Sequence, residues 1–463
     1  MKLSDLACRL KPFIDLFRLK SFDTSSDTGR SYERYRLIAL AGSSSFFSKI
    51  IISLMGLISV PLTINYLGKE QFGLWMVVSS LVAWLQLTDF GITNGLINAL
   101  AEANGRNDKT AACSYFSTAF YATAVITLFM VAPIVITIFF VPWAKALNIN
   151  NPLIVQDTKH CFGVLSLLFL LNMPLSIGNK ALTAYQKGYW VNITQVIAAL
   201  CSLLFLVIAI LIRFNLVGLV VLVSLGTVLG NILSWIILHR DIPWLRIHLN
   251  ESSKYALQRI AKSSVPLFLF QIGALLLNQS ANVILAHLAG LRIVADYNIL
   301  LKIYTVFYSI GISFSSPFYP AIREAFEKKE KRWVSNAIKR VTVVRLMILL
   351  IPVIPLIFIG DEMIVFWIRQ PLSASFGPIG WLCFLTCMII SGLCATWSEV
   401  LIILDHILSQ LHTVFANAFV FISFSILLVP QYGLVGFYIS FIIGMIYPTL
   451  WVLNKIRPFV IIT

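Results

Sequence analysis

Apolar stretches of membrane-spanning length recur along nearly the whole chain. A bilayer core about 30 Å thick needs roughly 20 apolar residues for each helical crossing, and twelve such stretches can be delimited. Their approximate limits are residues 38–67, 72–100, 111–140, 161–185, 190–212, 217–238, 265–289, 295–322, 338–359, 379–403, 411–429 and 434–454. Unbroken apolar runs such as Val217 to Leu238 exclude a membrane β-barrel, whose strands alternate in polarity. The pattern therefore predicts an all-α polytopic membrane protein.

Composition and the spacing of the spans indicate two halves. The chain has 463 residues, of which 59% are hydrophobic and 12% charged, so it carries more apolar surface than a soluble core buries. We expect a basic N-terminal tail (1–37), a six-helix bundle (38–238), a basic linker (239–264), a second six-helix bundle (265–456) and a short tail (457–463). The N-terminal tail is either an interfacial amphipathic helix or a flexible basic segment.

Basic residues predict the orientation. Of the 35 lysines and arginines, 27 lie in the tails and in alternate loops on the same side, six lie in the opposite loops, and Lys49 and Lys302 lie within spans. Because Lys and Arg accumulate on the cytoplasmic side, both termini are predicted to be cytoplasmic. Topology and anionic lipids then explain the net charge of +15, and nucleic acid is not expected as a partner.

A weak internal repeat supports the division into halves. When the chain is shifted by 222 residues, Ala99, Glu102 and Ala103 align with Ala321, Glu324 and Ala325. The shift places the second span on the eighth. Because each half has an even number of spans, the two halves are predicted to be parallel repeats about an axis along the membrane normal.

Polar residues within four spans fall on single helix faces. They are Ser45, Lys49, Ser53, Gly56 and Thr63 in the first span, Ser79, Gln86, Asp89 and Thr93 in the second, Gln271, Asn278 and Asn282 in the seventh, and Lys302, Thr305, Ser309, Ser313 and Ser316 in the eighth. If the first two spans join at a turn between Asn65 and Gln71, Lys49 and Asp89 lie at similar depth. The stripes predict a water-filled cavity between the halves, lined by these four spans.

Close helix packing and a buried ion pair are the alternatives to a cavity. Small polar residues allow close helix packing in membranes, which accounts for the serines, threonines and glycines. A structural ion pair between Lys49 and Asp89 accounts for those two charges but leaves Lys302 unexplained, although an unpaired charge at that depth costs roughly 2.5–3.5 kcal/mol. The second-half wall, Gln271 to Ser316, supplies Lys302 without a matching acid, so the cavity is predicted to be chemically asymmetric.

The first three spans also carry a family resemblance. Leu67-Gly-Lys-Glu-Gln-Phe-Gly-Leu-Trp75, Thr88-Asp-Phe-Gly-Ile92 and Ala101-Glu-Ala103 before a short basic loop resemble the polysaccharide exporters of the multidrug/oligosaccharidyl-lipid/polysaccharide (MOP) superfamily, in particular its O-antigen flippases (Wzx). The motifs are specific for the family and not for the sugar. The resemblance implies two six-helix bundles in a V shape with a central cavity, in the cytoplasmic (inner) membrane of a bacterium.

By resemblance, the function is to move an undecaprenyl-diphosphate-linked oligosaccharide from the inner to the outer leaflet. The oligosaccharide is a repeat unit of O-antigen, capsule or exopolysaccharide, and the implied partners are this lipid-linked substrate, membrane lipids, a polysaccharide polymerase and a chain-length regulator. Lys49 and Lys302 would bind the diphosphate as point charges. Asp89 would balance Lys49 or carry a coupling ion. The remaining candidate substrate-binding residues are Gln86, Gln271, Asn278 and Asn282, which are polar, and Trp84, Tyr304 and Tyr308, whose rings offer faces to sugars.

No cofactor, metal site or enzymatic activity is expected. The sequence contains no G-x-x-x-x-G-K-[ST] motif, so transport would be passive or coupled to H⁺ or Na⁺. The seven cysteines form no C-x-x-C pair and are interpreted as packing residues. There are three alternatives. A multidrug exporter of the same superfamily is disfavoured by the two cavity lysines, and a lipid II flippase usually has two more spans. A membrane polysaccharide polymerase or ligase would need a catalytic cluster, which the outward loops lack.

Overall fold

The computed structural model describes residues 27–149, 151–248, 253–315, 318–374 and 376–460, and every regular element among them is a helix. The first half contains α2 (Asp27–Ala83), η1 (Trp84–Asp89), α3 (Ile92–Gly105), α4 (Lys109–Phe140), α5 (Trp143–Ala146), α6 (Pro152–Leu175), α7 (Ile177–Ala184), α8 (Gly188–Leu211) and α9 (Leu216–Asp241). The second half contains α10 (Lys254–Ala289), α11 (Leu291–Ser315), α12 (Phe318–Glu327), α13 (Lys331–Leu350), α14 (Val353–Ile368), α15 (Gly377–Ile403), η3 (Leu408–Gln410) and α16 (Leu411–Val460). The predicted all-α class is confirmed. Most of the predicted N-terminal tail, residues 1–26, lies outside the described residues.

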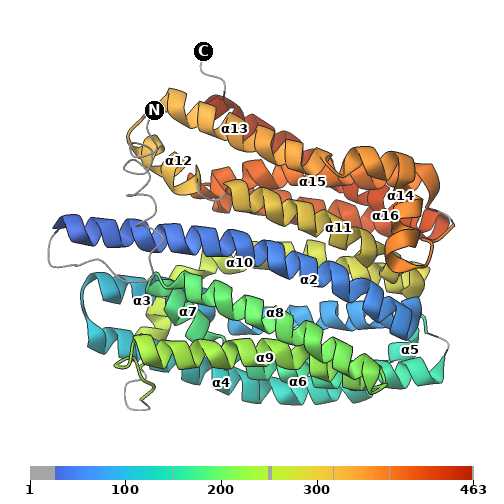
Figure 1. Cartoon of the computed structure of the whole chain (residues 1–463), viewed down its shortest axis with the longest axis horizontal. Helices are drawn as coiled ribbons and strands as arrows, with labels where there is room; N and C mark the ends of the chain where they lie inside the picture. The colour runs from blue at the N-terminus through green and yellow to red at the C-terminus, as the bar shows by residue number, and fades with distance from the viewer. Residues whose placement is uncertain (1–26, 150, 249–252, 316–317, 375, 461–463) are drawn as a thin grey trace, which may run out of the picture.

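Two of the long helices each contain a reversal at a glycine. Gly68 in α2 has φ 80° and ψ 164°, and Gly433 in α16 has φ 55° and ψ −129°. These positive φ angles suit glycine, which has no Cβ to clash. Figure 1 shows α2 turning back at one end of the molecule, inside the segment where a turn is predicted.

The described helices agree with the predicted number of spans. Nine of them, or ten if the bent pair α13 and α14 forms one crossing, are long and apolar enough to cross a membrane. Since α2 and α16 each double back, each supplies two crossings, and the ten helices then provide the predicted twelve. The chain is a multi-pass membrane protein.

The second span is not the continuous helix that was expected from residues 72–100. After α2 ends at Ala83, the chain forms the short 3-10 helix η1, and Phe90 (φ 49°) and Gly91 (φ 76°) adopt left-handed conformations before α3 begins. The Asp89 carboxylate accepts hydrogen bonds from the Gly91 amide at 2.8 Å and the Thr93 hydroxyl at 2.6 Å. Short polar side chains compete in this way with regular helical bonding. The predicted helical stripe of the second span is therefore interrupted at Asp89.

The ninth span also differs from its expected limits. Helix α13 ends at Leu350, and α14 continues to Ile368 after a bend of 48°. Residues 360–368, predicted to belong to an outward loop, are thus helical. Pro352 precedes α14 and cannot donate a backbone hydrogen bond, which explains the interruption.

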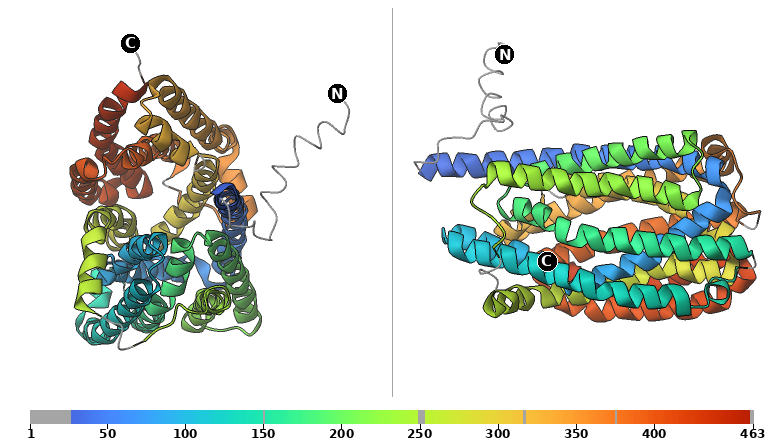
Figure 2. Two further views of the ribbon diagram at one scale, coloured as in Figure 1. Left: turned by 90° about the vertical axis from the view of Figure 1, so that its left-hand side faces the viewer. Right: turned by 90° about the horizontal axis from the view of Figure 1, so that it is seen from below.

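The largest apolar core shared by the two halves lies at the Gly68 end. Viewed along the helices, the halves form two groups (Figure 2, left). At the end that contains Gly68, Ile64 and Leu74 from the first half belong to the same buried cluster as Leu291 and Val294 from the second. Toward the opposite end, where α2 begins, the described core residues form smaller clusters. One lies around Leu96 and includes Ile260 at the start of α10, and the others lie within the second half. The molecule is therefore closed at the Gly68 end.

Polar contacts reinforce this closed end. The ammonium of Lys69, directly after the turn, forms an ion pair with Asp296 at the start of α11 and donates a hydrogen bond to the Pro371 carbonyl at 2.6 Å. Asp296 also accepts a bond from the Ser373 amide at 2.9 Å. Farther along α2, the Trp367 indole donates to the Leu57 carbonyl at 3.0 Å. Each of these contacts to α2 joins one half to the other.

Candidate functional site

The Lys302 side chain lies between the two halves and packs against a glycine. A Cβ built at Gly56 on α2 would lie 2.0 Å from the Lys302 Nζ atom, so the absence of a side chain there admits the lysine. The surrounding cavity, called the lysine cavity, has a volume of about 490 Å³ and is lined by α2, α8, α9 and α11, including Ser59 and Asn298. Among the described residues, no acid pairs with Lys302. An unpaired ammonium in a cavity at membrane depth is suited to bind an anion.

Lys49 faces a charged network that belongs to the second half. Arg345 on α13 is only 2% exposed and donates to the Glu399 carboxylate at 2.5 Å. Glu399 on α15 also accepts hydrogen bonds from the Tyr308 hydroxyl at 3.1 Å and from Tyr319. The remaining guanidinium bonds go to the hydroxyls of Ser315 (2.8 Å), Thr396 (3.1 Å) and Tyr319 (2.8 Å). Lys49 is within electrostatic range of both Glu399 and Arg345.

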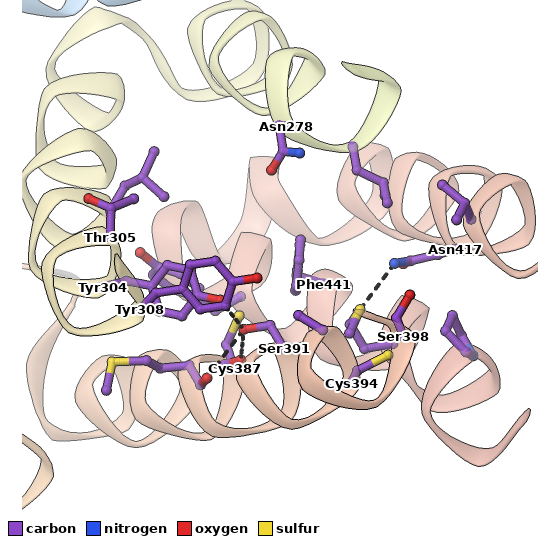
Figure 3. A pocket seen from close by; sticks show the side chains of 18 of the residues that line it. Asn278, Tyr304, Thr305, Tyr308, Cys387, Ser391, Cys394, Ser398, Asn417 and Phe441 are labelled. Carbon is purple, nitrogen blue, oxygen red and sulfur yellow. Dashed lines mark hydrogen bonds between the residues drawn. The ribbon is translucent and has the colours of Figure 1, made fainter. Parts of the chain in front are cut away.

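Tyr304 and Tyr308 line a second cavity, inside the second half. Their rings stack with centroids 5.4 Å apart and planes inclined by 22°. This tyrosine cavity, of about 420 Å³, is bounded by α10, α11, α15 and α16. Figure 3 shows the two rings side by side, with Asn278 on the opposite wall and Ser391 below them. Ser391 donates a hydrogen bond to the Tyr304 hydroxyl at 3.3 Å, so the cavity combines ring faces with a few fixed polar groups.

Asp89 lines a third cavity, mostly within the first half. This amide cavity, of about 430 Å³, contains a carboxylate and the ammonium of Lys180 on α7, which lies within electrostatic range of Asp89. Its other polar side chains are amides and hydroxyls: Gln86, Thr93, Asn94, Asn172, Ser176, Asn231 and Gln271. Among the described residues neither Asp89 nor Lys180 forms a direct ion pair, and both line this cavity.

Comparison with known proteins places the chain in a family. The sequence profile of a family described as polysaccharide biosynthesis protein matches residues 40–326, which is more than half of the chain. The chain belongs to this polysaccharide biosynthesis protein family. The predicted resemblance to polysaccharide exporters is confirmed at the level of the family.

Relatives and solved structures agree with that membership. The chain is 21% identical to a protein named putative O-antigen transporter from Salmonella typhimurium, over 65% of this chain and 68% of the relative. It is 23% identical to a putative O-antigen export protein from Yersinia pseudotuberculosis, over 64% and 69%.

Two solved structures share the fold. One is an inward-facing multidrug resistance MATE family transporter of the MOP superfamily, with a TM-score of 0.69, 15% identity and coverage of 91% of this chain and 94% of that one. The other is the lipid II flippase MurJ in an inward closed conformation, with a TM-score of 0.68, 13% identity and coverage of 90% and 87%. The predicted MOP-type fold is confirmed.

In this polysaccharide biosynthesis protein, the sequence-predicted residues do not line one cavity. Lys302 lines the lysine cavity. Tyr304, Tyr308 and Asn278 line the tyrosine cavity, whereas Gln86, Asp89 and Gln271 line the amide cavity. Trp84 begins η1 and lines none of these three.

Asn282 belongs to the contact between the halves. Its amide donates to the Ser80 hydroxyl at 2.6 Å and accepts from Asn298 at 2.7 Å. The side chain is only 6% exposed. A substrate-binding residue needs an accessible amide, whereas both ends of this one already hold neighbouring helices together.

Two expectations about charge were wrong. Among the described residues Lys49 and Asp89 form no ion pair: Asp89 lies within electrostatic range of Lys180, and Lys49 lies within range of Glu399 and Arg345. The stretch from Gln271 to Ser316 does contain an acid, Asp296, but this acid is already paired with Lys69 at the closed end.

Three charged residues near these cavities, Arg345, Lys180 and Glu399, were not among the site residues predicted from the sequence, although each lies inside a predicted apolar span. The count of basic residues assigns Arg345 and Lys180 to loops, and none of the four polar stripes includes Glu399. An ionisable residue within a span indicates a buried pair or a functional site. That rule, applied to every span rather than to four, finds all three.

Proposed function

We propose that this protein translocates an undecaprenyl-diphosphate-linked oligosaccharide, a repeat unit of a surface polysaccharide, from the inner to the outer leaflet of a bacterial cytoplasmic membrane. Family membership and relatives named for O-antigen transport support a flippase of this class. The orientation proposed with it, with both termini in the cytoplasm, follows from the distribution of Lys and Arg.

The observation that carries the proposal is the Lys302 ammonium in the lysine cavity. A diphosphate dragged through hydrocarbon needs a cation at membrane depth, and Lys302 supplies one that the described acids leave unpaired. Lys49 is a second cation on the same helix as Gly56, near Glu399. We assign the diphosphate to Lys302 and Lys49, with the polyprenyl chain remaining in lipid.

The closed Gly68 end supports alternating access. The large apolar core and the Lys69 to Asp296 pair join the halves at the end proposed to face outward, whereas at the other end the described core residues form smaller clusters, of which one joins Ile260 on α10 to the first half. This arrangement suits loading from the cytoplasmic leaflet. Release would require the Gly68 end to open.

No ATP is required by this proposal. Moving two negative charges outward across an inside-negative membrane gains about 2.3 kcal/mol per charge per 100 mV. Coupling to H⁺ or Na⁺ therefore remains optional. We assign Asp89 the role of balancing Lys180 in the empty protein, in place of the expected balance of Lys49.

The test is Lys302→Met in cells that depend on this gene for their surface polysaccharide. Methionine keeps much of the apolar stem and removes the charge. Because a hydrogen bond to a charged group contributes about 1.5–3 kcal/mol, we expect export to fall at least tenfold, measured as surface glycan per amount of membrane-inserted protein.

Lys145→Met is the matched control, since Lys145 is exposed on the short helix α5. Export by this variant should be normal. Normal surface glycan in both Lys302→Met and Lys49→Met would overturn the assignment of the diphosphate.

A further inference from the structure

The amide cavity has the chemistry of a carbohydrate receptor. A sugar presents several hydroxyls around a ring, and each hydroxyl left unpaired in an apolar site costs a few kcal/mol. The cavity offers amides and hydroxyls on several walls, with Phe169 as an aromatic face. Its volume of about 430 Å³ lies within the usual range of small-molecule sites, about 300–1,000 Å³.

A chain of hydrogen bonds holds two of these amides in place. Asn231 donates to Asn172 at 2.7 Å, and Asn179 donates to Asn231 at 2.7 Å. Ser234, which is fully buried, then donates to Asn179 at 2.5 Å. Each amide oxygen has two lone pairs and each amide nitrogen two protons. The lining amides Asn172 and Asn231 are therefore oriented from behind and retain bonding capacity toward the cavity.

Two charged side chains, Asp89 and Lys180, also line the amide cavity. Asp89 is 8% exposed, and its two oxygens each accept one bond, from Gly91 and from Thr93. Lys180 lies within electrostatic range of it without a direct contact among the described residues. A carboxylate and an ammonium that line the same cavity suit sugar hydroxyls, which donate to the carboxylate and accept from the ammonium.

The other two cavities are less suited to a sugar's hydroxyls. The tyrosine cavity is lined mainly by rings and aliphatic groups, and the lysine cavity places a cation among mostly apolar side chains. The polar groups that suit a sugar ring and the cation that suits a diphosphate thus lie in different cavities.

We infer that the amide cavity binds a hydroxyl-bearing sugar of the lipid-linked substrate and discriminates among glycans, while Lys302 and Lys49 hold the diphosphate. This inference rests on the proposed function. It makes Asn94, Gln86, Asn172 and Asp89 residues that determine sugar specificity.

Two residues allow a test that leaves the framework intact. The side chains of Gln86 and Asn94 line the cavity, and neither makes a hydrogen bond to another described residue. Gln86→Ala/Asn94→Ala therefore removes sugar contacts without breaking the chain behind Asn172. Asn98→Ala is the matched control, because Asn98 lies one turn farther along α3, exposed and outside the cavity lining.

The measurement is binding to the purified full-length protein in lipid nanodiscs. The probes are undecaprenyl diphosphate and undecaprenyl diphosphate carrying one N-acetylhexosamine. We expect wild type and Asn98→Ala to bind the sugar-bearing lipid at least tenfold more tightly than the bare one. The double variant should lose most of this preference, because each hydrogen bond contributes about 0.5–1.5 kcal/mol, and should bind the bare lipid normally. Lys302→Met should weaken both lipids by the same factor.

The outcomes separate the two proposals. A double variant that keeps the preference, or that loses affinity equally for both lipids, overturns the sugar site. A wild type that binds both lipids equally well also overturns it and leaves the flippase proposal standing. A wild type that binds neither lipid overturns the proposed function and this inference with it.

Discussion

Asp296→Asn is the sharpest test of the closed end. The carboxylate is 2% exposed and accepts bonds from Lys69 across the two halves and from the Ser373 amide at 2.9 Å. Lys69 is 13% exposed and also donates to the Pro371 carbonyl at 2.6 Å. Asparagine keeps the shape of the side chain and removes its charge, so the ammonium of Lys69 would remain largely buried without a counter-charge.

The size of the effect follows from the burial of the pair. Removing one partner of a buried ion pair costs about 3–5 kcal/mol. Because the bond from Lys69 to Pro371 survives and asparagine still accepts a hydrogen bond, we take the lower figure, about 3 kcal/mol. The pair joins the two halves, so this cost falls on the closed arrangement alone. At 1.36 kcal/mol per tenfold change, the ratio of closed to open molecules falls about 150-fold.

The assay is labelling of a single cysteine at position 59. Ser59 lines the lysine cavity and lies about 12 Å along α2 from Leu67, the last residue before the turn, at 1.5 Å per residue. In a variant without the seven native cysteines, a membrane-impermeant maleimide added outside should label Ser59→Cys up to about 150-fold faster after Asp296→Asn.

Asp361→Asn provides the control for this experiment. Asp361 is an exposed acid on α14 whose described hydrogen bond, from the Trp381 indole at 3.0 Å, stays within the second half. This substitution should leave the labelling rate unchanged. An unchanged rate in Asp296→Asn, or an equal rise in both variants, would refute the view that the Lys69 to Asp296 pair holds the Gly68 end closed.

Two further substitutions probe packing and the charged network. Gly73→Ala places a Cβ 2.0 Å from the Leu291 carbonyl oxygen of the other half, so it should separate the halves and raise the labelling of position 59. At Gly42 an added Cβ meets nothing within 4 Å, so Gly42→Ala should leave the labelling of position 59 unchanged. Arg345→Met leaves the carboxylate of Glu399 without its ion-pair partner and should destabilise the protein by about 3–5 kcal/mol, seen as a lower thermal unfolding temperature in detergent. Adding Glu399→Gln should restore part of this loss, and a double variant no more stable than the single one would contradict the pairing.

The sequence by itself determined the class, the number of crossings and the first turn. The twelve apolar stretches and the turn at Gly68 follow from local properties, because the bilayer sets the length of each span and glycine alone favours the backbone angles of that turn. The sequence also placed Lys302 on a polar stripe of its span. Depth along a helix is readable in this way because the rise per residue is constant.

Which residues meet across helices was decided only by the tertiary structure. Lys49 and Asp89 have the same sequence distance from the turn, yet the helix breaks at Asp89 and this carboxylate lies within electrostatic range of Lys180. Arg345 and Glu399 are 54 residues apart and pair through the packing of α13 on α15. Helical periodicity defines a face and a depth, but the neighbour of that face depends on how helices from distant parts of the chain pack. For that reason the polar stripes predicted one cavity, whereas the fold distributed some of their residues among three cavities and placed others, such as Asn282, in contacts between helices.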